Sequence, residues 1–219
     1  QGPGPKTYMY PKLLDDIFKV KNARSKMVLL ASDEGALIEL QQCETPLIQK
    51  TPPEKFLAPD LTYGNDGWKE KLGKERIRTY YFGAGHTNGD SLVHFEHANI
   101  VHLGDLLFNR RHPYVDKNAG AHMGNWITVL DKALTTFDAN TKYVCGHAGE
   151  GYDVLPKADD LKAFRDYLGN VLKFTESEIR LGKSKEEILK AKEIPGSPEW
   201  KGSGIERPLG AAYTELTVK

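Results

Sequence analysis

The sequence predicts an α/β domain, because strand-like apolar runs alternate with segments of helical apolar spacing. A continuous apolar run at residues 26–32 is followed by helical spacing at 33–42. The runs at 91–95 and 99–103 are separated by a short connection, so they predict a β-hairpin. A further buried strand is predicted at 142–145.

The remaining elements follow from residue type and spacing. Residues 75–82 are rich in β-branched and aromatic side chains and predict a strand. Apolar residues recur on one helical face at 123–137 and again at 157–181, so both segments are predicted helices. Ser184 and Glu187 form a Ser-x-x-Glu capping box, which predicts a helix to about residue 192. A short helix at 13–20 and a last helical turn at 210–216 complete the prediction.

Composition excludes several classes of protein. Apolar residues make up 39% of the 219 residues, which is enough for a core and too many for a disordered chain. The 30 basic and 30 acidic side chains balance, so there is no electrostatic basis for binding nucleic acid or an anionic membrane. No apolar run approaches the ~20 residues of a membrane helix. Localisation stays open.

Cysteine usage does not indicate a disulfide framework or a thiolate metal site. Cys43 and Cys145 are far apart in the sequence and do not form a Cys-x-x-Cys pair. Two reduced thiols are the preferred interpretation, and a single bridge between them stays open.

Three polar residues follow apolar strand-like runs and are flanked by glycines. They are His86, Asp105 and His147. Loops at strand ends are where sheet scaffolds place functional groups, and histidine with carboxylate is a ligand set that suits zinc or iron. Each residue alone has a simpler interpretation, as a hydrogen-bonding loop histidine or an Asx turn. Their order along the chain is what favours a metal site.

The series Gly-His-Thr-Asn-Gly-Asp-Ser, Gly-Asp-Leu-Leu-Phe and Gly-His resembles the second half of the metallo-β-lactamase superfamily. The resemblance covers about residues 26–219. It implies a metallo-β-lactamase-like αββα sandwich, incomplete at the N-terminal side, with a C-terminal helical extension. The expected organisation is an α/β domain at 1–155 and a helical extension at 156–219 packed on the same domain.

The resemblance also implies a role for each site residue. His86 corresponds to the third histidine of a first metal site, Asp105 to a carboxylate that bridges two metals or binds the second, and His147 to the histidine of the second site. Asp90 is expected to orient His86 by accepting from its ring. Two further residues are expected on the substrate side, namely Asn109 and His112.

The superfamily motif His-x-His-x-Asp-His is absent from the sequence, since none of the seven histidines precedes residue 86. Two explanations stay open: the first half of the fold lies outside this chain, or the motif has degenerated. The three remaining ligands are expected to hold at most one zinc ion with an open position, and a metal-free chain is the other outcome. Missing strands would expose a sheet edge, which leads to the hypothesis of a homodimer formed by strand completion or a domain swap.

The resemblance therefore implies a zinc-dependent hydrolase, in which a metal-activated water attacks an ester, lactone, thioester or lactam carbonyl of a small molecule. The alternative is a non-catalytic scaffold or binding module with an incomplete metal site. The metal content of the purified protein distinguishes these two hypotheses.

Overall fold

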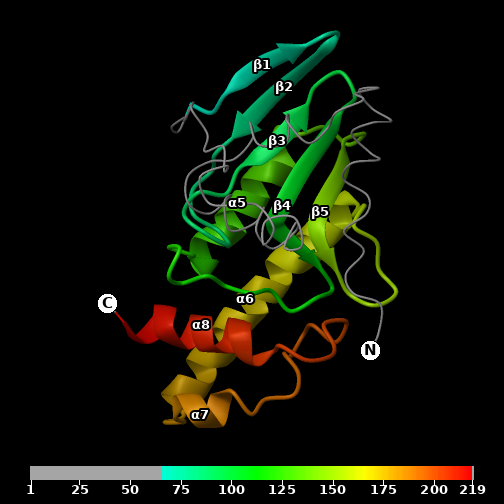
Figure 1. The fold of residues 1–219 in the computed structure, drawn as a ribbon. Coiled ribbons are helices and arrows are strands. Elements are labelled where there is room, and N and C mark those ends of the chain that lie inside the picture. The colour runs from blue at the N-terminus through cyan, green and yellow to red at the C-terminus, as the bar shows by residue number, and fades with distance from the viewer. Residues whose placement is uncertain (1–65, 219) are drawn as a thin grey trace, which may run out of the picture. The chain divides into compact units, whose positions relative to one another are not determined.

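A five-stranded sheet is the centre of the part of the chain that the structure, a computed structural model, describes, residues 66–218 (Figure 1). The strand order follows the sequence, β1-β2-β3-β4-β5. The bounds are β1 Lys69–Leu72, β2 Glu75–Tyr80, β3 Leu92–Phe95, β4 Ile100–Asn109 and β5 Lys142–Ala148. The elements predicted before residue 66 lie outside the described residues.

Strand direction explains the connections. The strands from β1 to β4 pair antiparallel, whereas β4 and β5 pair parallel. A parallel pair needs a crossover, and helix α5 (Met123–Thr136) lies in that connection. The predicted hairpin between β3 and β4 is confirmed, and its turn places Asn99 at φ 51°. The result is the mixed α/β fold that the sequence predicts.

Strand β4 is longer than predicted, and this changes the setting of Asp105. The prediction that the strand ends at Leu103 is wrong, because pairing with β5 continues to Asn109. The register shifts between His102 and Gly104, and again between Gly104 and Phe108. Asp105 therefore lies inside an irregular part of a central strand and does not follow the strand's end.

The C-terminal helices are α6 (Ala158–Arg180), α7 (Lys185–Ile188) and α8 (Glu206–Thr217). The capping box of Ser184 and Glu187 is present, but α7 ends at Ile188 and not near residue 192. Helix α8 is longer than the predicted last turn. Strand β1 was not predicted, because its sequence Lys-Glu-Lys-Leu has the polarity of a solvated loop; it lies at the sheet edge and is mostly exposed.

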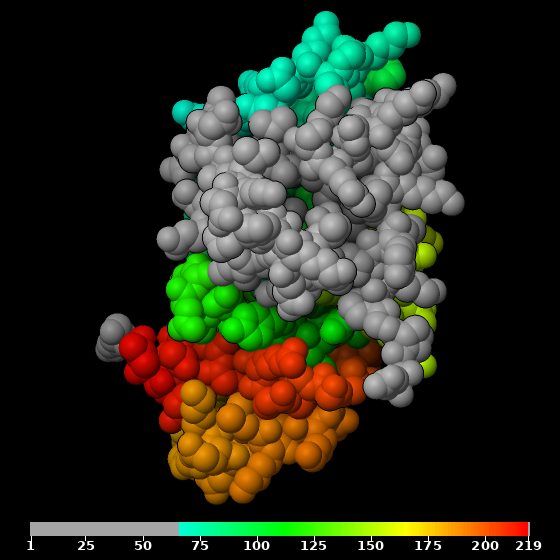
Figure 2. Space-filling view, viewed as in Figure 1, coloured from blue at the N-terminus to red at the C-terminus, as the bar shows by residue number. Residues whose placement is uncertain are grey.

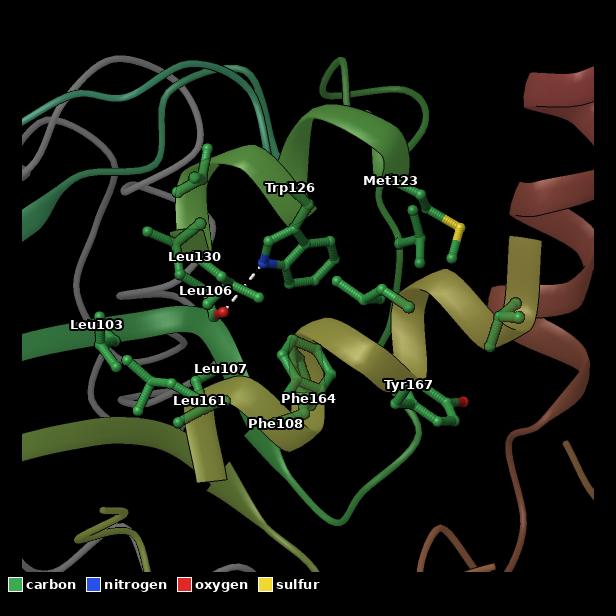
Figure 3. Close-up of a cluster of buried hydrophobic side chains, with 14 of the residues drawn as sticks. Leu103, Leu106, Leu107, Phe108, Met123, Trp126, Leu130, Leu161, Phe164 and Tyr167 are labelled. Atoms are coloured by element: carbon green, nitrogen blue, oxygen red, sulfur yellow. Dashed lines mark hydrogen bonds between the residues drawn. The ribbon is translucent and has the colours of Figure 1, made fainter. Parts of the chain in front are cut away.

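The main apolar core lies between the sheet and helices α5 and α6 (Figure 3). Trp126 of α5 and Phe164 of α6 are fully buried and meet edge to face, with ring centroids 5.5 Å apart. Phe108 of β4 lies within 6.4 Å of both rings. This aromatic cluster supports the half of β4 that carries Asp105.

The described residues, 66–218, belong to one compact unit. Helix α6 packs against both α5 and α8, so the C-terminal helices share the core of the sheet domain. Within residues 66–218, none of the helices has the length and apolar character needed to cross a bilayer.

Candidate metal centre

The fold brings His86, Asp105 and His147 together from three separate segments. His86 lies in the loop between β2 and β3, Asp105 in β4 and His147 near the end of β5. The Nε2 atom of His86 is 3.8 Å from Oδ2 of Asp105, and Nε2 of His147 is 3.2 Å from Oδ1. Thus each oxygen of one carboxylate faces a different imidazole.

This arrangement divides the ligands into two pairs that share Asp105. The geometry matches a carboxylate between two half-sites better than three donors around one ion. Among residues 66–218, no group of three or more His, Cys, Asp or Glu side chains is arranged to hold a metal ion. The donor types suit zinc, and each half-site would need further ligands to complete a tetrahedral set.

Glycine at position 146 allows β5 to approach Asp105. A Cβ atom on Gly146 would lie 2.2 Å from Oδ1 of Asp105 and 3.1 Å from the carbonyl oxygen of Gly104. Any side chain there would displace the carboxylate from His147. The glycine before His147 is therefore required by the close packing of the two strands.

The loop before His86 is held by the first turn of α5. The side-chain amide of Asn125 donates to the carbonyl of Ala84 over 2.6 Å, and the backbone N–H of His122 donates to Gly85 over 3.0 Å. A Cβ on Gly85 would lie 2.7 Å from Leu106, so this glycine also permits close packing.

Aromatic rings surround the two histidines. The ring of His147 stacks on Phe108 with centroids 4.7 Å apart, and His86 lies 5.9 Å from Trp126. Tyr114, 6.4 Å from His86, is 46% exposed and faces solvent. Sequence reasoning did not assign these rings to the site, because their spacing signals only core packing.

Asp105 is prepared to remain ionised. Burial acts to raise the pKa of its carboxyl, but the hydrogen bond and charge of His147 and the charge of His86 outweigh burial, so the pKa lies below its usual value. These contacts therefore favour the ionised form of the Asp105 carboxyl.

The other predicted residues have partners within the protein. Asp90 accepts from the backbone N–H of Thr87 over 2.7 Å and from its hydroxyl over 3.0 Å. Its Oδ1 is 3.7 Å from Nδ1 of His86, which is beyond hydrogen-bond length. Asp90 therefore braces the loop beside His86, and its role in orienting the ring stays a prediction.

Asn109 and His112 are both buried. The amide of Asn109 donates to the carbonyl of Asp153 over 2.9 Å. Nδ1 of His112 lies 2.7 Å from the hydroxyl of Tyr167 on α6. Their known contacts fix the loops around the site, and a substrate contact for either residue stays a prediction.

Comparisons with solved structures identify proteins that share this fold. The fold is similar to that of the inverting sec-alkylsulfatase Pisa1 from Pseudomonas sp., with a TM-score of 0.59 and 14% identity over 74% of this chain. The chain spans only 27% of that protein. A metallo-beta-lactamase from Pontibacter korlensis gives a TM-score of 0.46 at 16% identity, over 71% of this chain and 76% of that protein.

A search of the curated proteins finds no match to this sequence. By contrast, the sequence profile described as "Metallo-beta-lactamase superfamily" matches residues 13–147, which include His86, Asp105 and His147. That match covers more than half of the chain. The chain therefore belongs to the metallo-beta-lactamase superfamily.

Proposed function

We propose that this protein is a zinc-dependent hydrolase of small esters, lactones, thioesters or lactams. The observation that carries the proposal is the placement of one ionised carboxylate, Asp105, between the Nε2 atoms of His86 and His147. Histidine nitrogens and carboxylate oxygens are common zinc ligands in proteins. A bound zinc ion would supply an activated water and polarise the carbonyl of the substrate.

The protein's own residues prepare the site for this chemistry. Asp105 contributes negative charge within a buried setting, where electrostatic attraction is weakly screened. The buried rings of Phe108 and Trp126 pack against His147 and His86 and form the apolar inner side of the site. The exposed ring of Tyr114 offers an apolar surface next to His86 for the non-reacting part of a substrate.

The alkylsulfatase likeness supports the fold alone, since identity is 14%. It adds one substrate class to test, a sulfate ester, alongside the carbonyl compounds. Pocket loops, and not the fold, decide among these substrates.

The test is zinc content of the purified 219-residue chain by elemental analysis, followed by calorimetric titration with zinc. We expect about one zinc per chain, with binding lost in Asp105→Asn, because both donor pairs share Asp105, and weakened in His86→Ala and in His147→Ala. Asp105→Asn keeps the size of the side chain and removes its charge. Hydrolysis of a panel of p-nitrophenyl esters, lactones, thioesters, lactams and sulfate esters then tests the activity.

His97→Ala is the matched control, because His97 is an exposed histidine in the β3–β4 turn whose side chain lies away from the site. It should bind zinc as the unaltered chain does. A chain that binds no zinc, or a His147→Ala variant that binds it equally well, would contradict the proposal and favour the non-catalytic scaffold.

A further inference from the structure

We propose that Glu215 on α8 is a positioning residue for the candidate metal centre. It holds the first turn of α5, which in turn holds the loop that carries His86. The C-terminal helix would thereby help to set the geometry of the His86 loop, which lies more than 100 residues away in the sequence. The expected effect on zinc binding rests on the proposed function. The effect of Glu215 on the position of the His86 loop does not.

The carboxylate of Glu215 binds the N-terminus of α5 with both oxygens. Its Oε2 accepts from the backbone N–H of Met123 over 2.8 Å, and its Oε1 from that of Gly124 over 2.9 Å. These N–H groups have no partner within their own helix, and the positive end of a helix favours a carboxylate. Helix α5 has no acidic residue in its first turn, so α8 supplies one.

The same turn of α5 contacts the two residues before His86. Asn125 donates to the carbonyl of Ala84, and the N–H of His122 to that of Gly85. The fit is tight, because a Cβ at Gly83 would lie 2.6 Å from the Asn125 amide. A shift of this turn would therefore move the loop.

Glu215 also reaches a second segment that holds the loop. The ammonium group of Lys117 lies 3.3 Å from its Oε2 and donates to the carbonyl of Ala121. The neighbouring Asp116 donates its N–H to the carbonyl of His86 over 3.3 Å. In the space-filling view, the red surface of α8 lies against the green surface of this β4–α5 region (Figure 2).

The burial of Glu215 fits a positioning role. Its side chain is only 13% exposed. Glutamate side chains are mostly exposed, so this burial indicates a contact that the protein maintains. Within residues 66–218, its hydrogen bonds and ion pairs lie on the two segments that bind the His86 loop.

Hydrogen–deuterium exchange of the full chain without added metal tests the structural part. Glu215→Gln keeps the size of the side chain and removes its charge. We expect peptides covering residues 83–91 to exchange about 5- to 10-fold faster, because the charge-assisted contacts to α5 are weakened. Peptides in α6 should be unchanged, which would show that the fold is retained.

The matched control is Glu187→Gln. Glu187 also accepts from a backbone N–H at a helix start, that of Ser184 over 2.8 Å, but it serves α7 only. Exchange at 83–91 should not change in this variant. Asn125→Ser, which removes the donor to Ala84 without touching Glu215, is the second variant and should also speed exchange at 83–91. Unchanged exchange there in both Glu215→Gln and Asn125→Ser would overturn the inference.

Zinc titration of the same proteins tests the consequence. Glu215→Gln should weaken zinc binding about 3- to 10-fold, and Glu187→Gln should not change it. Equal zinc affinity in Glu215→Gln and the unaltered chain would overturn the positioning role even if exchange were faster. If the unaltered chain binds no zinc, the proposed function fails, and the exchange experiment alone decides whether Glu215 holds the loop.

Discussion

Replacing Trp126 by phenylalanine would remove one hydrogen-bond donor from the wall of the candidate metal centre. The indole Nε1 of Trp126 donates to the carbonyl of Leu106 over 2.9 Å in a fully buried setting (Figure 3). Leu106 lies in the irregular stretch of β4 between Gly104 and Phe108, where it has no partner in the register with β5. The indole therefore donates to a buried carbonyl next to Asp105, at a position where the register with β5 is interrupted.

The size of the effect has two parts. Leaving the buried carbonyl of Leu106 without its donor costs about 1–3 kcal/mol. The smaller ring leaves a cavity, which adds on the order of 1 kcal/mol at about 24 cal/mol per Å³. We therefore expect Trp126→Phe to lower the free energy of unfolding by about 2–4 kcal/mol.

Urea unfolding followed by circular dichroism measures this loss, and Trp200→Phe is the matched control. Trp200 is 4% exposed, but within residues 66–218 its buried Nε1 has no hydrogen-bond partner. The same change there removes an unsatisfied donor, which offsets the cavity, so the expected loss is about 1 kcal/mol or less. Equal losses in the two variants, or a loss below 1 kcal/mol for Trp126→Phe, would refute the reasoning.

Two further predictions concern Gly146 and His102. Gly146→Ala places a Cβ 2.2 Å from Oδ1 of Asp105, so we expect a loss of about 1–3 kcal/mol in urea unfolding and at least about 10-fold weaker zinc binding. Gly169→Ala on α6 is the control and should not destabilise, because its Cβ would make only an ordinary van der Waals contact with Ile127, at 3.9 Å. A tolerated Gly146→Ala would contradict the packing argument. Burial lowers the pKa of His102 to about 4, against an opposing effect of the Asp105 charge. Because the unfolded chain takes up this proton near pH 6.5, stability should be unaffected above that pH and fall by up to about 3 kcal/mol between pH 6.5 and 4. In His102→Asn, the free energy of unfolding measured in urea should fall less steeply between pH 6.5 and 4. If its pH dependence matches that of the unaltered chain, His102 is not the group responsible.

The spacing of apolar residues along the chain was sufficient to predict the amphipathic helices. The helical face of Trp126 and Leu130 predicted α5, and the spacing of Leu161, Phe164 and Leu168 predicted α6, because each helix buries one stripe. Strand β1 was missed because its charged residues lack an apolar alternation, and pairing with β2 alone makes it a strand.

The glycine-flanked motifs also identified the three candidate ligands in advance. His86 and His147 were named from short local patterns, and the fold places both next to Asp105. What the patterns could not supply was the setting of Asp105 inside β4, because the irregular register arises from pairing with a strand about 40 residues later. Strand ends depend on such partners and not on local sequence alone.

The sequence by itself determined the superfamily, the order of the elements other than β1 and the three residues of the candidate metal centre, because these depend on side-chain type and short spacing. Only the tertiary structure decided that one oxygen of Asp105 faces each histidine, and that Glu215 binds the first turn of α5 from 91 residues away. Hydrogen-bond geometry is set within a few tenths of an ångström by contacts between distant segments. No local pattern in a sequence encodes such distances.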